Sequence, residues 1–423
     1  MFYGGLGLVL SVAVLVALLA HSSPGSSSPT ATPGDVVRRD RPEPAQLPVA
    51  PAVPPSGVVA TTPAGPPSLR VTGVSAPSVI APPEGSPLRT IRRDCPLSAP
   101  LSDGRTLWIF CDTSDFSPAG KLRTFVNTTA AFSEPGEPGP VHEPYDRDRH
   151  PFRFLTPTGD YRPCAAGQTR LIWPHATVTV PQADGRDRVL IYYQSVCSAG
   201  GVGLTTELFR DVGLAEYLYD PKQPPAADTP IRGTVLREQL FARPADAVET
   251  FGSGAAYDGS LVYVYRCERV GRCYVGRVDP AAVADPAAYG YWNGVDWQGT
   301  IGQAAPMALA GGGTGFAMKP SVRYLADRKL WVLADAAQFG AGTINLRLAH
   351  RPEGPWGPAA AVVPSDCTGT YPRQCLGVEV HPQFGDAGTL ALSYYNPAVP
   401  LGESPVRFVR VSIEVDDRTR AHQ

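Results

Sequence analysis

The apolar residues of this chain recur in short runs, each of which follows a tight-turn sequence. Five such units occur: SDGRTLWIFCD from Ser102, ADGRDRVLIYYQ from Ala183, YDGSLVYVYRC from Tyr257, ADRKLWVLAD from Ala326 and GDAGTLALSYYN from Gly385. Three of them carry Asp-Gly, a dipeptide that tolerates the positive φ angles of tight hairpins. The runs are rich in β-branched and aromatic residues and lack proline, so each unit predicts a turn followed by a strand.

The segments before the later four turns also have the composition of strands: ATVTVP, FGSGAAY, KPSVRYL and GVEVHPQF. The units recur at intervals of roughly 60 to 80 residues, which leaves room for one four-stranded sheet of about 40 to 50 residues and its loops. Sustained helical periodicity is absent from the sequence. The pattern predicts an all-β fold, a five-bladed β-propeller, with a β-sandwich of similar strand density as the alternative.

Composition divides the chain into three parts. Residues 1–20 contain the uncharged run GGLGLVLSVAVLVALLA, which predicts a signal peptide or a membrane anchor, and export in either case. Residues 21–89 consist mainly of Pro, Ala, Ser, Thr and Gly. Such a segment buries too little apolar surface to offset its ordering entropy, so a disordered linker is expected. Residues 90–423 remain for the propeller.

The apolar N-terminal run leaves two outcomes open. It lacks a basic n-region, and Leu18 interrupts the small-residue pattern of a cleavage site before His21. Cleavage would release the protein, whereas retention would tether it to the membrane through residues 4–20. The expected location is extracytoplasmic in both cases.

The charge balance argues against a nucleic-acid partner. The chain carries 37 Lys and Arg against 39 Asp and Glu, and no basic run is long enough to follow a phosphate backbone. The pairs Arg38-Arg39 and Arg92-Arg93 are interpreted as solvated linker charge. We expect a monomer.

Eight cysteines, at positions 95, 111, 164, 197, 267, 273, 367 and 375, indicate an oxidising compartment. None forms a CxxC motif, which disfavours structural zinc. No metal site and no cofactor are expected, with calcium left open. Two pairs close short loops, and nearest-neighbour pairing gives the hypothesis Cys95–Cys111, Cys164–Cys197, Cys267–Cys273 and Cys367–Cys375.

Polar residues gather at the expected ends of the strands. A hairpin returns the chain to the face it left, so the start of each inner strand and the end of each second strand share one rim of the central channel. The second strands end at Asp112, Gln194 or Ser195, Arg266, Asp335, and Tyr395 or Asn396. The inner strands begin at Trp173, His175, Ser253, Lys319, Glu379 and His381. Such a rim suits a sugar chain, so a polysaccharide is the expected partner.

Glycoside hydrolysis requires two carboxyl groups, one as acid and one as base or nucleophile. Asp112 is the first candidate, and Asp335 and Glu143 are the proposed partners from a wider set that includes Asp115, Asp146, Glu207 and Glu379. Lys319 or Arg266 nearby would hold a carboxylate ionised, as a base requires, whereas burial or a second carboxylate would raise the pKa of an acid. Other chemistries lack their motifs, since the chain has neither GxSxG nor GxxxxGK[ST].

Several stretches resemble the actinobacterial propeller proteins of the DUF4185 family. They are TLWIFCDTSDF with VNTTAAF, FGSGAAYDGSLVYVYRC with CYVGRVDP, YGYWNGVDW, PSVRYLADRKLWVL with RPEGPWGPA, and VEVHPQFGDAGTLALSYYN, which span about Leu101 to Asn396. The resemblance implies a five-bladed propeller similar to glycoside hydrolases. Some members of the family are endo-acting arabinofuranosidases that cut the D-arabinan of mycobacterial envelopes.

The resemblance also implies roles for single residues. Asp112 matches the aspartate of the family's Gly-Asp-Thr and would be a catalytic carboxylate, and Asn127 matches the asparagine that follows and would orient Asp112 or the sugar. His381 and Asn396 match the HP and SYN positions of the last blade. Cys111 stands where the family has glycine, so the rim near Asp112 departs from the family pattern.

The leading expectation is an exported glycoside hydrolase that acts on a furanose-rich envelope polysaccharide. The alternative is a non-catalytic propeller that binds a glycan or a protein, because a fold does not fix a function. A second buried carboxylate facing Asp112 would discriminate between them.

Overall fold

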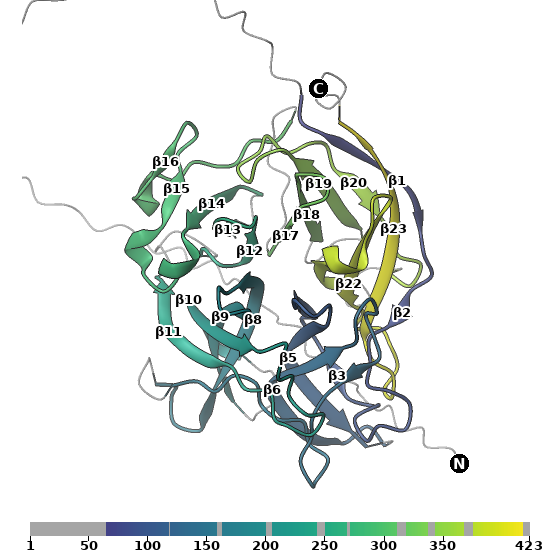
Figure 1. Cartoon of the computed structure of the whole chain (residues 1–423). Helices are drawn as coiled ribbons and strands as arrows, with labels where there is room; N and C mark the ends of the chain where they lie inside the picture. Colours follow the sequence, from purple (N-terminus) through teal and green to yellow (C-terminus); the bar gives the residue numbers. More distant parts are fainter. Residues whose placement is uncertain are drawn as a thin grey trace, which may run out of the picture. The chain divides into compact units, whose positions relative to one another are not determined.

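Five antiparallel sheets surround a central axis in the computed structural model and form a five-bladed β-propeller (Figure 1). The structure describes residues 65–117, 119–158, 163–199, 205–242, 250–268, 271–310, 319–336, 343–367 and 375–417. All of these belong to one compact unit. Their regular elements are strands and short 3-10 helices, so the expected all-β propeller is confirmed. The apolar run of residues 1–20 lies outside the described residues.

Each blade is built from strands that are consecutive in the sequence, except at the closure of the ring. Blade I contains β3 (Arg92–Arg93), β4 (Leu97–Pro100), β5 (Thr106–Phe116), β6 (Leu122–Ser133) and β7 (Val141–His142). Blade II contains β8 (Gln168–Pro181), β9 (Asp187–Ala199), β10 (Thr205–Tyr219) and β11 (Thr234–Phe241). Blade III contains β12 (Gly254–Tyr257), β13 (Val262–Cys267), β14 (Cys273–Val278), β15 (Gly290–Trp292) and β16 (Trp297–Gln298).

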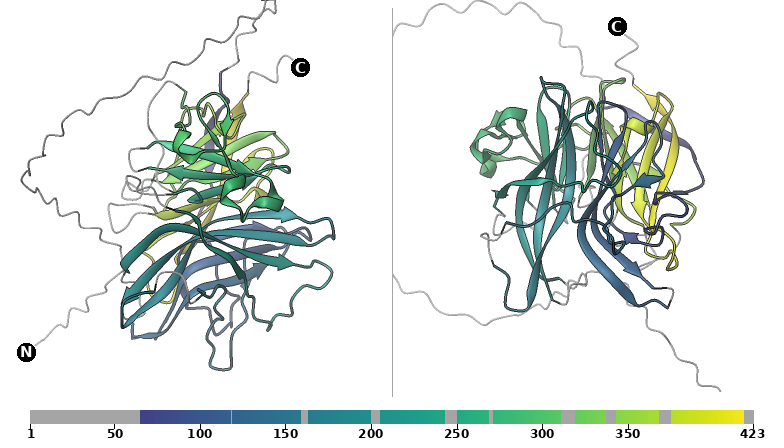
Figure 2. Two further views of the ribbon diagram at one scale, coloured as in Figure 1. Left: turned by 90° about the vertical axis from the view of Figure 1, so that its left-hand side faces the viewer. Right: turned by 60° about the horizontal axis from the view of Figure 1, so that its bottom comes forward.

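The two remaining blades complete the ring (Figure 1), and Figure 2 shows the strands of the propeller from two further sides. Blade IV contains β17 (Ser321–Leu325), β18 (Leu330–Ala336), β19 (Ile344–Ala349) and β20 (Ala360–Val362). Blade V contains β21 (Leu376–Val380), β22 (Thr389–Tyr395), β23 (Val406–Asp416), β1 (Ser68–Val74) and β2 (Ser78–Val79). The short helices are η1 (Pro280–Ala282), η2 (Pro286–Ala288), η3 (Ile301–Gln303) and η4 (Pro382–Phe384). In the described part of the chain, no helix is long and apolar enough to cross a membrane.

The predicted turns connect the first strand of each blade to its second. The Asp-Gly turns adopt the expected geometry, because Gly104, Gly185 and Gly259 have φ angles of 86°, 85° and 97°. A side chain at these angles would be strained, so glycine is the residue that allows the tight reversal. The local sequence thereby fixes where each inner strand ends and the second strand begins.

The ring is closed by a strand that the sequence analysis placed in the linker. β1 pairs with the C-terminal strand β23 in antiparallel register, from Ser68 opposite Asp416 to Val74 opposite Val411, and the two lie side by side at the edge of blade V (Figure 1). Leu69 is 8% exposed and packs in the same core as Ile413. The linker predicted for residues 21–89 therefore does not reach residue 89. Residues 21–64 of it lie outside the described residues.

Apolar side chains fill the space between neighbouring blades. Trp108 and Phe110 of blade I pack against Phe384 and Phe408 of blade V, and both are fully buried. Burying one such side chain stabilises the fold by about 1.5 to 3 kcal/mol. These contacts fix the position of adjacent blades relative to each other. The same packing therefore fixes the positions of the residues at the rim of the channel.

Four disulfides link the cysteines in the predicted pairs: Cys95–Cys111, Cys164–Cys197, Cys267–Cys273 and Cys367–Cys375. Each joins residues of one blade or of its connecting loop. The nearest-neighbour hypothesis for the connectivity is confirmed.

Candidate functional site

Two aspartates lie opposite each other where β3 ends beside β5. β3 pairs with β5 through Arg93 and Thr113, and the next residues continue the contact. The backbone N–H of Asp94 donates to the carbonyl of Asp112 at 3.3 Å. The backbone N–H of Asp112 donates to Oδ1 of Asp94 at 2.9 Å. Because of this pairing, the two carboxyl groups are immediate neighbours.

Two side-chain donors hold the carboxylate of Asp112. Nδ2 of Asn127 donates to its Oδ1 at 2.9 Å, and Nε1 of Trp173 donates to its Oδ2 at 3.2 Å. Asn127 is the cross-strand partner of Asp112 on β6, and Trp173 comes from β8 of blade II. One carboxylate is therefore fixed by neighbours from two blades.

Asn127 is itself held in one orientation. It is 1% exposed, donates to the carbonyl of Ile172 at 2.9 Å and accepts from the N–H of Ile172 at 2.7 Å. The amide thus has all of its described bonds inside the protein. It is inaccessible to glycosylation in the folded chain, although Asn127-Thr128-Thr129 fits the acceptor pattern.

The two carboxyl groups titrate as a coupled pair. Burial, and after it the charge of Asp94, raise the pKa of Asp112 to about 7, against the lowering effect of the bonds from Asn127 and Trp173. Burial also raises the pKa of Asp94 to about 6, whereas the N–H of Asp112 and the charge of Lys319 lower it. The negative charge of Asp94 disfavours ionisation of Asp112, because two like charges at close range repel each other.

Residues from two more blades surround Asp94. Lys319, at the entry to blade IV, interacts electrostatically with both Asp94 and His175. Burial first, and Lys319 second, hold the pKa of His175 well below its usual range, so this imidazole is neutral. Burial and the charge of Asp94 raise the pKa of Tyr395 at the end of β22. Blades I, II, IV and V thus converge on one polar cluster.

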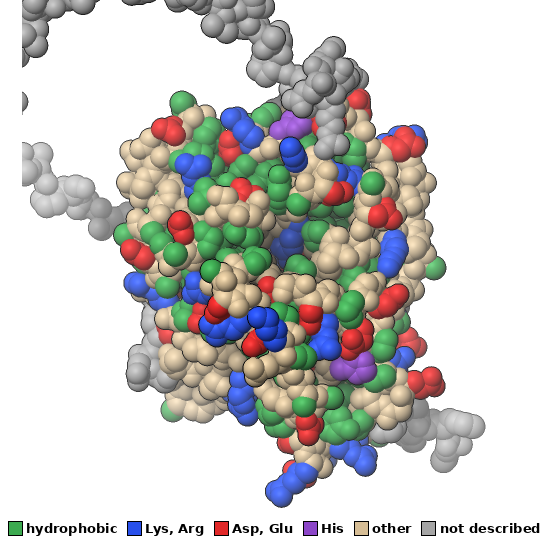
Figure 3. All heavy atoms as spheres, in the orientation of Figure 1, with side chains coloured by type: hydrophobic (Ala, Val, Ile, Leu, Met, Phe, Trp, Pro, Cys, Tyr) green, Lys and Arg blue, Asp and Glu red, His purple; other side chains and the backbone are tan. Residues whose placement is uncertain are grey.

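A hollow opens at the centre of the ring on the face shown in Figure 3, and a Lys or Arg side chain lies in its floor. Ring-shaped folds of this kind leave such a space because the inner strands cannot approach the axis completely. A ligand that enters along the axis would approach the inner strands from this face.

The expected partner Glu143 lies inside blade I, not beside Asp112. Its carboxylate forms an ion pair with Arg93, and the two side chains are 1% and 2% exposed. Burial raises the pKa of Glu143, while Arg93 lowers it. The guanidinium of Arg93 also stands over the ring of Phe110, with Cζ 4.4 Å from its centroid.

The interpretation of Arg92-Arg93 as solvated linker charge is wrong, because Arg93 is buried and Arg92 is bonded to the C-terminal blade. Arg93 is 2% exposed, and Nη1 of Arg92 donates to the carbonyls of Val399 and Pro400 at 3.0 and 2.9 Å. Both residues belong to β3, which begins blade I.

Asp335, the other expected partner, occupies a matching position in blade IV. It is 1% exposed and accepts a hydrogen bond from Asn345, its cross-strand partner, at 3.0 Å. Asp112 and Asn127 form the same Asp-to-Asn contact across β5 and β6. The two blades therefore repeat one local arrangement, and blade I adds a second aspartate, Asp94, to it.

The other expected binding residues have partners within the fold. Arg266 pairs with Glu268 at 3.3 Å and stands over the ring of Tyr274. Glu379 accepts from Ser321 at 2.7 Å. The buried ring of His381 contacts the hydroxyls of Ser98 and Ser393 at 2.5 and 2.7 Å, and Asn396 donates to Asp366. These bonds tie strands together and account for the polar character of these positions.

Four aromatic side chains of blades II and III differ in whether they contact the aspartate pair. Trp173 is half-buried and bound to Asp112, whereas Tyr291 is 3% exposed in the core between blades II and III. Trp292 and Trp297 pack against each other with ring centroids 5.7 Å apart. Trp173 is the one of these four that reaches the aspartate pair.

Asp94 was missed by the sequence analysis, which placed the start of the domain only four residues earlier. The signal was present in the predicted disulfide. Cys95 follows Asp94 and Cys111 precedes Asp112, so linking the two cysteines brings the two aspartates together.

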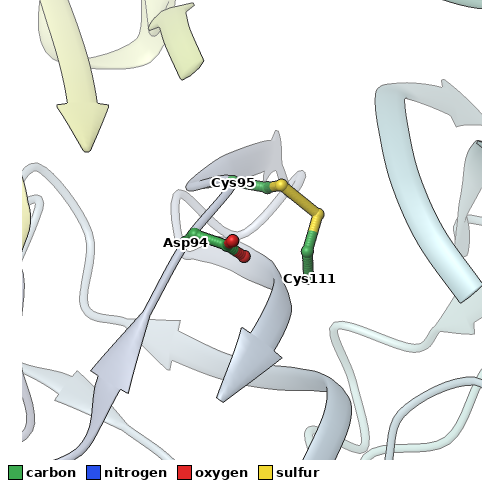
Figure 4. A group of neighbouring side chains, drawn as sticks. All are labelled: Asp94, Cys95 and Cys111. Atoms are coloured by element: carbon green, nitrogen blue, oxygen red, sulfur yellow. A yellow bond between two sulfur atoms is a disulfide. The ribbon is translucent and has the colours of Figure 1, made fainter. Parts of the chain in front are cut away.

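A carboxylate oxygen of Asp94 and the sulfur atoms of Cys95 and Cys111 lie within 4.8 Å of one another (Figure 4). Asp366, Cys367 and Cys375 form a similar group. In both groups the cysteines are joined in a disulfide and offer no thiolate, so the spacing does not make a metal site.

Residues 232–397 match the family model described as "Domain of unknown function (DUF4185)". This segment is similar to the DUF4185 family. The resemblance noted from the sequence is thereby confirmed, and blade I, with Asp94 and Asp112, precedes the matched residues. A comparison with curated proteins gives no match.

Solved structures similar to this chain include glycoside hydrolases. A candidate hydrolase from Bacteroides ovatus ATCC 8483 has 13% identity and a TM-score of 0.54, with 76% of this chain and 85% of that chain covered. Zg3597, a family 117 glycoside hydrolase of Zobellia galactanivorans, has 11% identity and a TM-score of 0.43, with 82% and 90% covered. The catalytic domain of the GH62 α-L-arabinofuranosidase of Coprinopsis cinerea has 10% identity and a TM-score of 0.41, with 80% and 96% covered. At these identities the likeness concerns the fold.

Proposed function

We propose that this protein is an exported glycoside hydrolase in which Asp94 and Asp112 are the catalytic carboxyl groups. The observation that carries the proposal is the position of Asp94 against Asp112: Oδ1 of Asp94 accepts from the N–H of Asp112 at 2.9 Å, and burial raises the pKa of both carboxyl groups. A second carboxylate facing Asp112 is the feature that was expected to separate a hydrolase from a binding propeller. Pairs of titratable groups with displaced pKa values are typical of acid and base assignments in active sites.

The two aspartates differ in their surroundings, and this difference suggests their roles. Asp94 is the more acidic member, because the N–H of Asp112 and the charge of Lys319 favour its ionised form. Asp112 holds the proton, since burial and the charge of Asp94 raise its pKa to about 7. In this assignment Asp112 protonates the leaving glycosidic oxygen, and Asp94 acts as base or nucleophile.

Asn127 and Trp173 then act as positioning residues. Each occupies one oxygen of Asp112 as a hydrogen-bond donor, so the carboxyl group keeps one orientation at the rim. Asp94 replaces Glu143 as the partner of Asp112 in this proposal, because Glu143 is occupied by Arg93 inside the blade. It also takes precedence over Asp335, because the backbone N–H of Asp112 donates directly to Asp94.

The proposed substrate is a furanose-rich polysaccharide of the cell envelope, such as a D-arabinan. Support comes from the match of residues 232–397 to DUF4185, together with what the resemblance of the sequence to the arabinan-cleaving members implies. The rim offers a half-buried indole in Trp173, and an aromatic face suits an uncharged polyhydroxylated ligand. Four disulfides support an exported protein, since disulfides persist in oxidising compartments.

The test is release of oligosaccharides from purified mycobacterial-type arabinogalactan by the full chain. Wild type is expected to release products, and Asp112→Asn and Asp94→Asn are each expected to lower the rate by at least about 100-fold. Asp115→Asn is the matched control on the same strand, because this carboxylate pairs with the exposed Arg123. Full activity in both Asp112→Asn and Asp94→Asn would refute the proposed catalytic pair. A wild-type protein that binds envelope glycans but cleaves none would favour the binding propeller.

A further inference from the structure

The Cys95–Cys111 disulfide joins the two residues that are next to Asp94 and Asp112 in the sequence. Cys95 directly follows Asp94, and Cys111 directly precedes Asp112, so the covalent link joins the nearest neighbours of both carboxylates. The two sulfur atoms and a carboxylate oxygen of Asp94 lie within 4.8 Å of one another (Figure 4). No other disulfide of the chain is adjacent in sequence to both members of this pair.

Regular sheet pairing is interrupted at this point. β3 is in register with β5 up to Arg93 opposite Thr113, and β4 resumes the register at Leu97 opposite Ile109. The N–H of Asp94 still donates to the carbonyl of Asp112 at 3.3 Å, and its carbonyl accepts from the N–H of Cys111 at 3.2 Å, whereas Cys95 and Pro96 leave the ladder. The backbone of Cys95 has a φ of 49°, the left-handed region that non-glycine residues rarely adopt. Asp94 is bonded to β5 through its backbone, whereas Cys95 and Pro96, which follow it, are outside the regular register and are joined to β5 by the disulfide.

The sulfur of Cys111 also fixes the disulfide against the neighbouring blade. It lies 3.4 Å from the carbonyl oxygen of Pro174, which follows Trp173, the donor to Asp112. Cys111 itself is 1% exposed. The link is thus part of the packed junction between blades I and II, and not an external staple.

From these observations we infer that the Cys95–Cys111 disulfide is a positioning element of the aspartate pair: it holds the irregular segment of Asp94 against Asp112 and sets the distance between the two carboxyl groups. The inference rests on the proposed function for its effect on catalysis. The geometric part of it concerns the two carboxyl groups alone.

The experiment compares wild type with C95S/C111S in the full chain. Carbon-13 NMR of labelled aspartate carboxyl groups, assigned with Asp94→Asn and Asp112→Asn, follows the titration of both aspartates. Wild type is expected to show an upper step near neutral pH. In C95S/C111S this step is expected to fall by about one pKa unit or more, because separation weakens the repulsion between the carboxylates.

C164S/C197S is the control. Its disulfide in blade II closes a loop of 33 residues, against 16 for Cys95–Cys111, so its removal costs at least as much stability by loop closure. It is expected to leave the upper titration step unchanged. If C95S/C111S does not fold, C95A/C111A is used, because it places no hydroxyl at the buried position of Cys111.

On a cleaved substrate, C95S/C111S is expected to lower kcat/KM about 100-fold, the cost of a displacement on the order of 1 Å in a catalytic group. An unchanged titration of both aspartates in the folded variant would overturn the inference, and so would an equal change in C164S/C197S. If no protein cleaves any glycan, the proposed function fails, and the NMR titration still decides the positioning role.

Discussion

Asp112→Asn is expected to gain stability relative to wild type as the pH rises. In wild type, ionisation of the half-buried Asp112 lowers the free energy of unfolding, and asparagine does not ionise. The folded-state pKa of Asp112 is about 7 against an ordinary value of 3.8, so the folded protein binds more protons than the unfolded chain between these values. Under this condition the free energy of unfolding falls as pH rises from about 4 to about 7. Asparagine does not ionise and removes the loss.

The magnitude follows from the displacement of the pKa. One pKa unit corresponds to about 1.36 kcal/mol, so the change from 3.8 to about 7 sets an upper bound of about 4 kcal/mol. Asp112 is only half-buried, and solvent screens the effect, so we expect a gain of about 1 to 2 kcal/mol at pH 8 relative to pH 4. The removed charge also favours ionisation of Asp94, with the same sign.

The assay is denaturant unfolding of wild type and Asp112→Asn at pH 4 and pH 8. Asparagine cannot accept from both Asn127 and Trp173 through two oxygens, so the variant loses about 1 kcal/mol at either pH, and the informative quantity is the difference between the two pH values. Asp115→Asn controls for the loss of one aspartate. A stability difference between wild type and Asp112→Asn that does not change with pH would refute the raised pKa of Asp112.

Three further outcomes are expected. Asn127→Ala removes a donor that lowers the pKa of Asp112, so the upper step of the pair should move to higher pH in an NMR titration. Lys319→Met removes a cation that lowers the pKa of Asp94, so the lower step should also rise, and an unchanged step would place Lys319 elsewhere. Deletion through residue 79 removes β1 and β2 from blade V, and it should lower Tm by several degrees relative to a chain that starts at residue 65, as measured by thermal unfolding.

Features that depend on neighbouring residues could be predicted from the sequence. The Asp-Gly turns at Gly104, Gly185 and Gly259 are local features, because the backbone conformation of two consecutive residues determines each turn. The short disulfide loops were predictable for the same reason. Asp112 and Asn127 were also found, and the structure shows why they belong together: they are opposite each other on the adjacent strands β5 and β6.

Features that depend on distant residues were not predictable in this way. β1 has no aromatic residue and follows a proline-rich segment, and it is a strand because β23, more than 300 residues later, pairs with it. Arg93 lies in a polar stretch that predicts a solvated charge, yet it is buried inside blade I, where it forms an ion pair with Glu143. Burial of a charge is stable only when its partner is buried with it, and the partner comes from the folded chain.

The sequence by itself determined the repeated hairpins, the number of blades and the four disulfides, because turn chemistry and strand composition act over a few residues. Only the tertiary structure decided which polar residues meet at the axis. Three blades contribute to this site, which contains Asp94, Asp112, Trp173 and Lys319. Burial raises the pKa of both aspartates, and the charge of Asp94 raises that of Asp112 further. Charge interactions and desolvation depend on distance in space, and the closure of the ring sets those distances.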